Sequence, residues 1–324
     1  MKLPPNGLGC MSLSHAYGVP PSRDEGLAML RAALDEGIGM LDTATLYGGG
    51  RNEELVGAAI AGRRDEVFLA SKCGMASVDG VKVIDGRPDT LRAQVDASLS
   101  RLGVDYIDLY YLHRWDKKVP IGDSVGALAE MVAAGKIGAI GLSEVSVSRL
   151  REAQAITSIA AVQNEYSLWS RNAELGMLDA TREDGVTLVA FSPVARGFLA
   201  DAIKDPAELA PNDIRRSMPR FQPEHWGANV TLLASWRELA AEAGCTPAQL
   251  ALAWLISRGD HVLPIPGTTS VAHLRENLAA ADISVDDALL ARAGELIGPA
   301  TISGARYAPA SAAEVDAETT EDAA

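Results

Sequence analysis

The sequence is poor in cysteine, with three in 324 residues: Cys10, Cys73 and Cys245. An odd number of widely spaced cysteines provides neither a disulfide framework nor a CxxC metal site. We therefore expect inert, buried thiols and no bound metal. Basic residues are also few, with 29 Lys and Arg against 43 Asp and Glu, which gives a net charge of −14. This charge opposes binding to nucleic acid or to an anionic membrane, and favours a small-molecule substrate.

Long apolar segments are missing as well. The sequence contains no uncharged apolar run long enough to cross a bilayer, and MKLPPNGLGC lacks the apolar stretch and cleavage site of a secretory signal. We expect a cytoplasmic protein. The length allows one large barrel or two ordinary domains, and nothing in the sequence indicates an oligomeric state.

One pattern repeats along the chain: an amphipathic helix, a glycine, and an apolar run that ends in polar residues. Gly37, Gly103, Gly135 and Gly185 mark the clearest cases. A glycine just past a helix supplies the left-handed C′ conformation, and the run beyond it is typical of a strand buried on both faces. The eight such runs span residues 7–11, 38–43, 67–72, 106–113, 137–143, 161–166, 187–192 and 262–267.

Helix start signals lie between these runs. Ser22 with Glu25 is a capping-box pattern, and Thr246 with Gln249 is another. Eight strands alternating with helices predict an α/β fold, a (β/α)8 TIM barrel with long loops at its C-terminal mouth, rather than an open sheet with a second domain. We expect a single domain over residues 1–310, with the long loop at 201–227 over the mouth, and an acidic, disordered tail at 311–324.

Four reactive side chains follow the C-terminal ends of predicted strands: Asp42, Tyr47, Lys72 and His113. In a parallel barrel these ends meet at one mouth. A lysine ammonium held by Asp42 would lower the pKa of the Tyr47 phenol, so that Tyr47 exchanges a proton with a carbonyl oxygen while His113 points an N–H at the same oxygen. Each residue alone is more commonly a surface or loop polar group. Together they favour carbonyl reduction, in which a cofactor supplies the hydride.

Several long motifs occur in order: LDTATLYGGGRNEELVGAAI, FLASKCG, SRLGVDYIDLYYLHRWD, GKIGAIGLSE, VQNEYSLWSR, AFSPVARGFL and PIPGTTSVAHLRENL. With these motifs the chain resembles the aldo-keto reductase superfamily from about Gly7 to Arg306, most nearly the bacterial and plant branch with HR after the fourth strand and SPxxRG after the seventh. The resemblance implies reversible reduction of aldehydes or ketones with hydride from NAD(P)H. It also implies Tyr47 as the acid/base, Asp42 and Lys72 as its tuning pair, and His113 as the residue that orients the carbonyl.

The same resemblance implies an extended cofactor across the mouth, expected to be NADPH with NADH as the alternative. Its nicotinamide carboxamide would contact Ser143, Gln163 and Glu144, which departs from the asparagine of many relatives, and its ring would stack on Phe191. The remaining implied contacts, to the pyrophosphate, the phosphate site and the adenine, are Ser192, Val194, Arg196, Gly197, Gly267, Thr268, Ser270, His273, Glu276 and Asn277. Lys or Arg of many NADPH-preferring relatives is replaced here by Thr269, Ser270 and His273.

For the substrate pocket we predict residues that follow strand ends, with Arg306 and Tyr307 above them: Met11, Tyr17, Trp115 and Trp169. Each alone is more commonly a packing residue.

The sequence offers three other interpretations. GLGCMS at residues 7–12 lacks the third glycine of a Rossmann fingerprint. A desolvated Lys72 at a strand end would also suit a Schiff-base aldolase. A barrel that binds NADPH and turns over slowly would suit a cofactor-sensing regulatory subunit.

Overall fold

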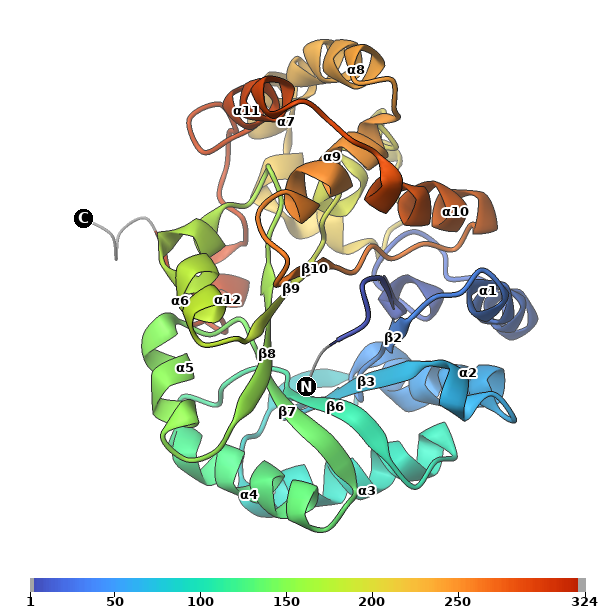
Figure 1. The fold of residues 1–324 in the computed structure, drawn as a ribbon, viewed down its shortest axis with the longest axis vertical. Coiled ribbons are helices and arrows are strands. Elements are labelled where there is room, and N and C mark those ends of the chain that lie inside the picture. Colours follow the sequence, from blue (N-terminus) through green and yellow to red (C-terminus); the bar gives the residue numbers. More distant parts are fainter. Residues whose placement is uncertain (1–2, 320–324) are drawn as a thin grey trace.

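A computed structural model describes residues 3–319, and within them all eight predicted runs form strands of one parallel sheet (Figure 1). The side chains of these strands are almost all buried, as continuous apolar runs require of a sheet covered on both faces. The strands are β1 (Gly7–Gly9), β2 (Met40–Asp42), β3 (Phe68–Cys73), β6 (Ile107–Leu112), β7 (Ile137–Ser143), β8 (Ile159–Glu165), β9 (Thr187–Phe191) and β10 (Val262–Pro264).

The sheet closes almost completely into a barrel. Each strand pairs with the next in the order β1-β2-β3-β6-β7-β8-β9-β10. At the seam, the Gly9 N–H donates to the Pro266 carbonyl over 3.3 Å. Glycine is required here because a Cβ on Gly9 would lie 3.0 Å from the Ile265 carbonyl oxygen. The predicted α/β barrel is confirmed.

Helices surround the barrel, and both predicted capping boxes are present, at Ser22 with Glu25 and at Thr246 with Gln249. In Figure 1, α7, α8 and α11 lie together beyond β9 and β10. The helices are α1 (Arg23–Asp35), α2 (Arg51–Ile60), α3 (Pro88–Leu102), α4 (Ile121–Ala133), α5 (Val147–Gln154), α6 (Met177–Glu183), α7 (Pro223–Val230), α8 (Leu232–Glu242), α9 (Pro247–Ile256), α10 (Val271–Ala279), α11 (Asp287–Leu296) and α12 (Pro309–Ala312).

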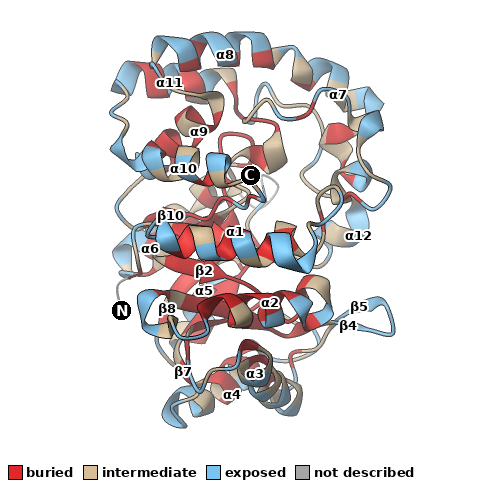
Figure 2. Ribbon diagram, turned by 90° about the vertical axis from the view of Figure 1, so that its right-hand side faces the viewer, coloured by how far each residue is buried: buried red, intermediate tan, exposed pale blue. Residues whose placement is uncertain are grey.

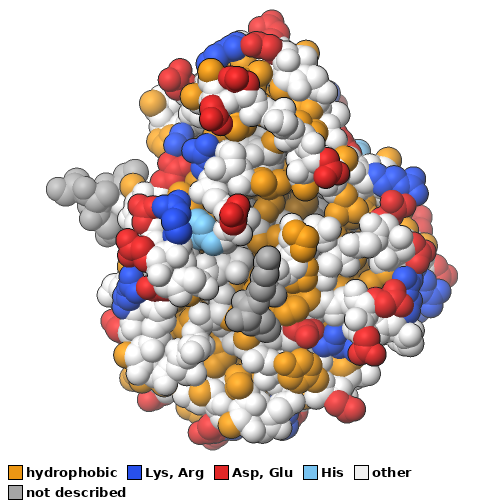
Figure 3. All heavy atoms as spheres, in the orientation of Figure 1, with side chains coloured by type: hydrophobic (Ala, Val, Ile, Leu, Met, Phe, Trp, Pro, Cys, Tyr) orange, Lys and Arg blue, Asp and Glu red, His pale blue; other side chains and the backbone are white. Residues whose placement is uncertain are grey.

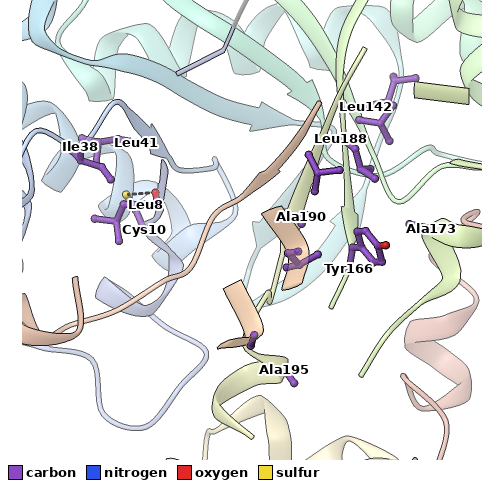
Figure 4. Packing of buried hydrophobic residues seen from close by; sticks show 14 of the residues in the cluster. Leu8, Cys10, Ile38, Leu41, Leu142, Tyr166, Ala173, Leu188, Ala190 and Ala195 are labelled. Carbon is purple, nitrogen blue, oxygen red and sulfur yellow. Dashed lines mark hydrogen bonds between the residues drawn. The ribbon is translucent and has the colours of Figure 1, made fainter. Parts of the chain in front are cut away.

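Two apolar layers hold these elements together. A smaller cluster fills the barrel interior and includes Met40, Leu109 and Tyr111. The larger cluster packs the outer faces of the strands against the helices, and Figure 4 shows part of it around Leu8 and Cys10. Burial raises the pKa of the Cys10 and Cys73 thiols, which keeps both protonated and inert as predicted, whereas Cys245 is only half-buried.

The structure contains a hairpin that the sequence did not predict. Strands β4 (Met75–Val78) and β5 (Val81–Ile84) pair antiparallel after β3 and project from the barrel, mostly exposed (Figure 2). Strand β4 begins two residues after Cys73, the last residue of β3. The hairpin therefore extends the rim at the carboxyl ends of the strands.

The long segment at 201–227 is confirmed as a connection at the mouth, although it contains short 3-10 turns and the start of α7. Its Ile214 N–H donates to the Ala16 carbonyl over 2.9 Å. The Asp213 carboxylate accepts the Gly18 N–H over 2.7 Å. These contacts tie the segment to the loop after β1.

The C-terminal segment differs from the disordered tail that we predicted. Over residues 311–319 it packs along the rim: Lys117 Nζ donates to the Ala313 and Val315 carbonyls over 3.0 Å, and Ser146 Oγ donates to Asp316 over 2.9 Å. We predicted disorder because this segment has few apolar residues, but these hydrogen bonds hold it in place instead. Residues 320–324 lie outside the described residues.

Charged side chains of both signs are spread around the face shown in Figure 3. Among the described residues, no single helix has the length and apolar composition to cross a membrane, although the bent pair Pro223–Glu242 and Pro247–Ile256 meets both criteria together.

The packing of β6 against β7 gives a stability test. A Cβ added to Gly141 would lie 2.3 Å from Cδ1 of the buried Tyr111 ring. We expect Gly141→Ala to lower the free energy of unfolding by about 1–3 kcal/mol, because a close-packed core resists added volume. Gly126→Ala on α4 is the control, since no heavy atom lies within 4 Å of its added Cβ. Urea unfolding followed by circular dichroism measures both, and equal midpoints would contradict the packing argument.

Candidate active site

The four predicted catalytic side chains meet at one end of the barrel. Lys72 Nζ forms a very short hydrogen bond with Asp42, and donates to the Thr43 carbonyl over 2.9 Å and to the Tyr47 hydroxyl over 3.3 Å. The Tyr47 and His113 rings stand edge to face with centroids 5.8 Å apart. All four side chains are at most 8% exposed. The arrangement follows from parallel strands that end at one rim.

Three glycines give Tyr47 its position. Gly48, Gly49 and Gly50 adopt φ of 59°, 65° and 91°, which turns the chain sharply between Tyr47 and the start of α2. A side chain at Gly50 would also meet Arg101, whose Cδ lies 2.7 Å from the Cβ position. The left-handed conformation strains any residue with a Cβ.

Further buried polar residues orient Asp42 and the chain beside Lys72. Gln163 Nε2 donates to the other Asp42 oxygen over 2.8 Å. The Thr43 hydroxyl donates to Asn52 Oδ1 over 2.6 Å, and Asn52 Nδ2 donates to the Cys10 carbonyl over 2.9 Å. We did not predict Asn52, which in the sequence is one polar residue within LDTATLYGGGRNEELVGAAI and has no pattern of its own.

The Lys72 ammonium stays charged despite complete burial. Burial lowers the pKa of Lys72, but the charges of Asp42 and Tyr47 outweigh it, so the pKa lies above its ordinary value.

The Tyr47 phenol behaves differently from our expectation. Burial raises its pKa, and the nearby Lys72 charge offsets that rise only in part, so the net shift is upward. The predicted lowering is wrong for the protein alone, because removing the phenolate from water costs more than one shared cation returns. Tyr47 is therefore a protonated donor at neutral pH.

Two histidines flank the phenol as neutral imidazoles. Burial, followed by the charges of Lys72 and Arg114, holds the pKa of His113 well below its ordinary value. Burial also lowers the pKa of His15, whose ring centroid lies 5.5 Å from that of Tyr47. Nδ1 of each ring is buried without a hydrogen-bond partner among the described residues. His15 was not predicted, since a single His in a loop carries no pattern.

A cavity of about 990 Å³ opens above these residues. Its lining includes Asp42, Tyr47 and His113, while Lys72 lies fully buried beneath them. The cavity crosses the mouth from the end of β6 to the N-terminal part of α10, and therefore has room for an extended ligand.

A family model for the aldo/keto reductase family matches residues 7–297. The chain belongs to the aldo/keto reductase family. It is 40% identical to the aldo-keto reductase yakc [NADP(+)] of Schizosaccharomyces pombe, over 98% of this chain and 95% of that protein.

Solved structures agree with this membership in the family. The glycerol dehydrogenase AKR11B4 from Gluconobacter oxydans is 25% identical with a TM-score of 0.82, and the alignment covers 95% of each chain. The aldo/keto reductase from Klebsiella pneumoniae, solved with NADP and acetate, is 29% identical with a TM-score of 0.72, over 94% of this chain and 96% of that chain.

Most of the predicted cofactor residues line the cavity of this family member: Ser143, Gln163, Phe191, Ser192, Val194, Arg196, Gly197, Gly267, Thr268, His273, Glu276 and Asn277. Thr269 joins them. Ser270 lies just outside, where its hydroxyl caps α10 by accepting the His273 N–H. The helix N-terminus that it caps faces the cavity side, and such an end suits a phosphate group.

Two of the predicted cofactor residues are engaged in buried ion pairs. Glu144 does not line the cavity; it accepts from Arg306 over 2.7 Å and from the Glu165 N–H over 2.7 Å. Arg196 does line it, but its guanidinium donates to Glu165 over 2.7 Å and to the Tyr17 hydroxyl over 3.0 Å. Both side chains hold loops in place at the mouth.

Two of the four residues that we predicted for the substrate pocket line the cavity. Met11 and Tyr17 line the cavity, as does Tyr307, whereas Trp115 and Trp169 do not. The Trp115 indole N–H donates to the Val119 carbonyl over 2.9 Å, and Arg149 stacks on its ring. Trp169 packs in the core with its ring centroid 4.2 Å from that of Phe198. Arg306 lies behind the rim with Glu144.

The neutral state of His113 predicts a pH effect on stability. With its folded pKa well below 6.5, the folded protein binds fewer protons at His113 than the unfolded chain does below about pH 6.5. Below about pH 6.5, the free energy of unfolding should therefore fall by up to about 1.4 kcal/mol for each unit by which the pH is lowered. His113→Gln should lack this contribution while retaining those of the other histidines. Urea unfolding at pH 7.5, 6.0 and 5.0 measures the difference, and parallel curves would contradict a neutral His113.

Proposed function

We propose that this reductase transfers hydride from NADPH to the carbonyl carbon of a small aldehyde or ketone, reversibly, with Tyr47 as the proton donor. The observation that carries the proposal is the contact of the buried Lys72 ammonium with both Asp42 and Tyr47 on the cavity floor. The names of the relatives, one an NADP(+) enzyme and one solved with NADP, support the choice of cofactor.

Each member of the tetrad has a role that follows from its charge state. The neutral Tyr47 phenol gives its proton to the developing alkoxide, and the Lys72 ammonium stabilises the phenolate left behind. Asp42 keeps Lys72 charged and fixed. The neutral His113 donates one N–H to the carbonyl oxygen, which orients and polarises it.

The cavity suits an extended dinucleotide, which when bound supplies the hydride. Ser143 and Gln163 would hold its carboxamide, Phe191 would stack on the nicotinamide ring, and the segment from Ser192 to Gly197 would follow the pyrophosphate. Within that segment Ser192 and Arg196 have φ of 52° and 57°, so the backbone curls tightly beside the cavity. The lining residues at the start of α10 would hold the remaining phosphate and the adenine: Gly267, Thr268, Thr269, His273, Glu276 and Asn277.

The aldolase alternative is disfavoured by the state of Lys72. Schiff-base formation needs a neutral amine that a substrate can reach. Lys72 is completely buried, its pKa is raised, and its ammonium hydrogens are directed at Asp42, Thr43 and Tyr47. The regulatory-subunit alternative predicts the same binding of NADPH as the proposal, and differs from it only in a slow rate of turnover. The cytoplasmic location stays a prediction from the sequence.

The assigned acid is tested by Tyr47→Phe. We expect kcat to fall by about two to four orders of magnitude, because the proton donor is lost, while the Kd for NADPH changes little. Loss of nicotinamide absorbance measures turnover, and quenching of protein fluorescence measures binding. Tyr106→Phe, at a half-exposed tyrosine remote from the cavity, is the matched control. Turnover by Tyr47→Phe equal to that of the control would reject the assignment.

The cofactor and the reaction are tested together by a panel of aldehydes and ketones with NADPH and NADH in separate assays. We expect reduction with both and a higher kcat/KM with NADPH. Because no Lys or Arg stands at Thr269, Ser270 or His273, the preference should be smaller than a bidentate arginine would give. Tight NADPH binding without turnover of any carbonyl compound would favour the regulatory subunit.

A further inference from the structure

The Lys and Arg side chains of the cavity lining are paired with carboxylates except at one residue. Four lining residues are Lys or Arg: Lys82, Arg114, Arg196 and Arg215. Lys82 pairs with Glu314 over 2.5 Å, Arg196 with Glu165 over 2.7 Å, and Arg215 with Asp213 over 2.6 Å. Within residues 3–319, no carboxylate lies within 4.0 Å of Arg114. Arg114 is thus a half-buried cation with an unmatched charge.

The Arg114 guanidinium also has unused donors. Its Nη1 donates to the His113 carbonyl over 2.6 Å and to the Ser143 hydroxyl over 3.1 Å, which fixes its position at the rim. Nε and Nη2 make no hydrogen bond to any described residue. These two nitrogens form one edge of the guanidinium, and that edge matches the two oxygens of a carboxylate.

The position of Arg114 indicates which ligand this edge serves. It follows His113 at the end of β6 and touches Ser143 at the end of β7. Its charge opposes part of the rise in the pKa of Tyr47 and contributes to the lowered pKa of His113, which places it within electrostatic reach of the reacting carbonyl. The phosphate-binding candidates follow β9 and β10, and β7 and β8 separate those strands from β6 in the sheet. An anion received by Arg114 would therefore be separate from the phosphates of the cofactor.

We propose that Arg114 binds the carboxylate of the substrate, so that the preferred substrates are aldehydes or ketones that also carry a carboxylate group. The carbonyl oxygen lies between Tyr47 and His113, and the carboxylate accepts from Nε and Nη2 of Arg114. An anion bound there offsets the cost of an unpaired cation in a partly desolvated site. This inference rests on the proposed reduction of carbonyl compounds.

The test compares 4-carboxybenzaldehyde, which carries a carboxylate, with its neutral methyl ester, methyl 4-formylbenzoate, together with their 3-substituted isomers. For the wild type with NADPH, we expect kcat/KM to be at least about tenfold higher for the carboxylate of one isomer pair, mainly through a lower KM. Arg114→Met should lower kcat/KM for that carboxylate by about 10- to 100-fold and change it for the ester by less than about threefold. Arg114→Lys should restore part of the preference, since it returns the charge without the planar fork.

Control measurements separate recognition from a structural role. Arg92→Met on the outer face of α3 removes the same charge far from the cavity and should leave the preference unchanged. Equal losses for acid and ester in Arg114→Met, or a matching loss of NADPH affinity, would overturn the inference and assign Arg114 to positioning or to the cofactor. A wild type that reduces both aldehydes equally well would also overturn it and leave the proposed function intact. If other carbonyl compounds are reduced but these aldehydes are not, this inference alone is rejected; if no carbonyl compound is reduced, the proposed function is rejected and this inference with it.

Discussion

The buried pair of Lys72 and Asp42 is the interaction on which the rest of the site depends. A charged ammonium with no exposure is tolerable only when its hydrogens meet acceptors, and here a carboxylate, a carbonyl and a phenol provide them. Three chain segments must be in register for this to happen: the end of β2, the inner face of β3 and the turn after β2. The same contacts that satisfy the lysine also fix the phenol, so stability and chemical competence are linked through one cation.

A second set of ion pairs holds the loops around the mouth. Burial raises the pKa of Glu165, but Arg196 and two further arginines lower it to about 2, so the carboxylate stays ionised. Glu165 also accepts from the Tyr307 hydroxyl over 2.9 Å, and neighbouring Glu144 accepts from Arg306. These bonds attach the segment before α12 to the ends of β7 and β8. Resemblance to relatives assigned Glu144 to the cofactor, whereas the structure gives it a partner within the chain.

Much of the fold could be predicted because the signals are local and repeated. A glycine after a helix marked four strands most clearly, and apolar runs that end in polar residues identified all eight strands of the barrel, with differences only at the ends. The β4–β5 hairpin was missed because its short, exposed strands carry no apolar alternation facing a core. The docking of residues 311–319 was missed because backbone carbonyls and distant side chains provide its anchors.

The site could be predicted where its reactive side chains lie at or just after the C-terminal ends of strands. Asp42, Tyr47, Lys72 and His113 meet as expected, but Trp115 and Trp169 turn away, because no periodicity tells which way a side chain points once a strand has ended. The direction of the Tyr47 pKa depends on the depth of burial, which the sequence does not contain. His15 and Arg114 likewise became visible only when the loops were placed beside one another.

The seam between the first and last strands has a mechanical consequence. Every other pair of neighbouring strands is joined by a ladder of main-chain hydrogen bonds. Between β1 and the chain just after β10, the bond from Gly9 to Pro266 is the only main-chain hydrogen bond among the described residues. A closed barrel is least constrained where the fewest hydrogen bonds join neighbouring strands. The wall at Gly9 and Gly267, which line the cavity, is therefore held by the fewest main-chain hydrogen bonds, whereas β2 and β3, which carry Asp42 and Lys72, are paired with neighbours on both sides.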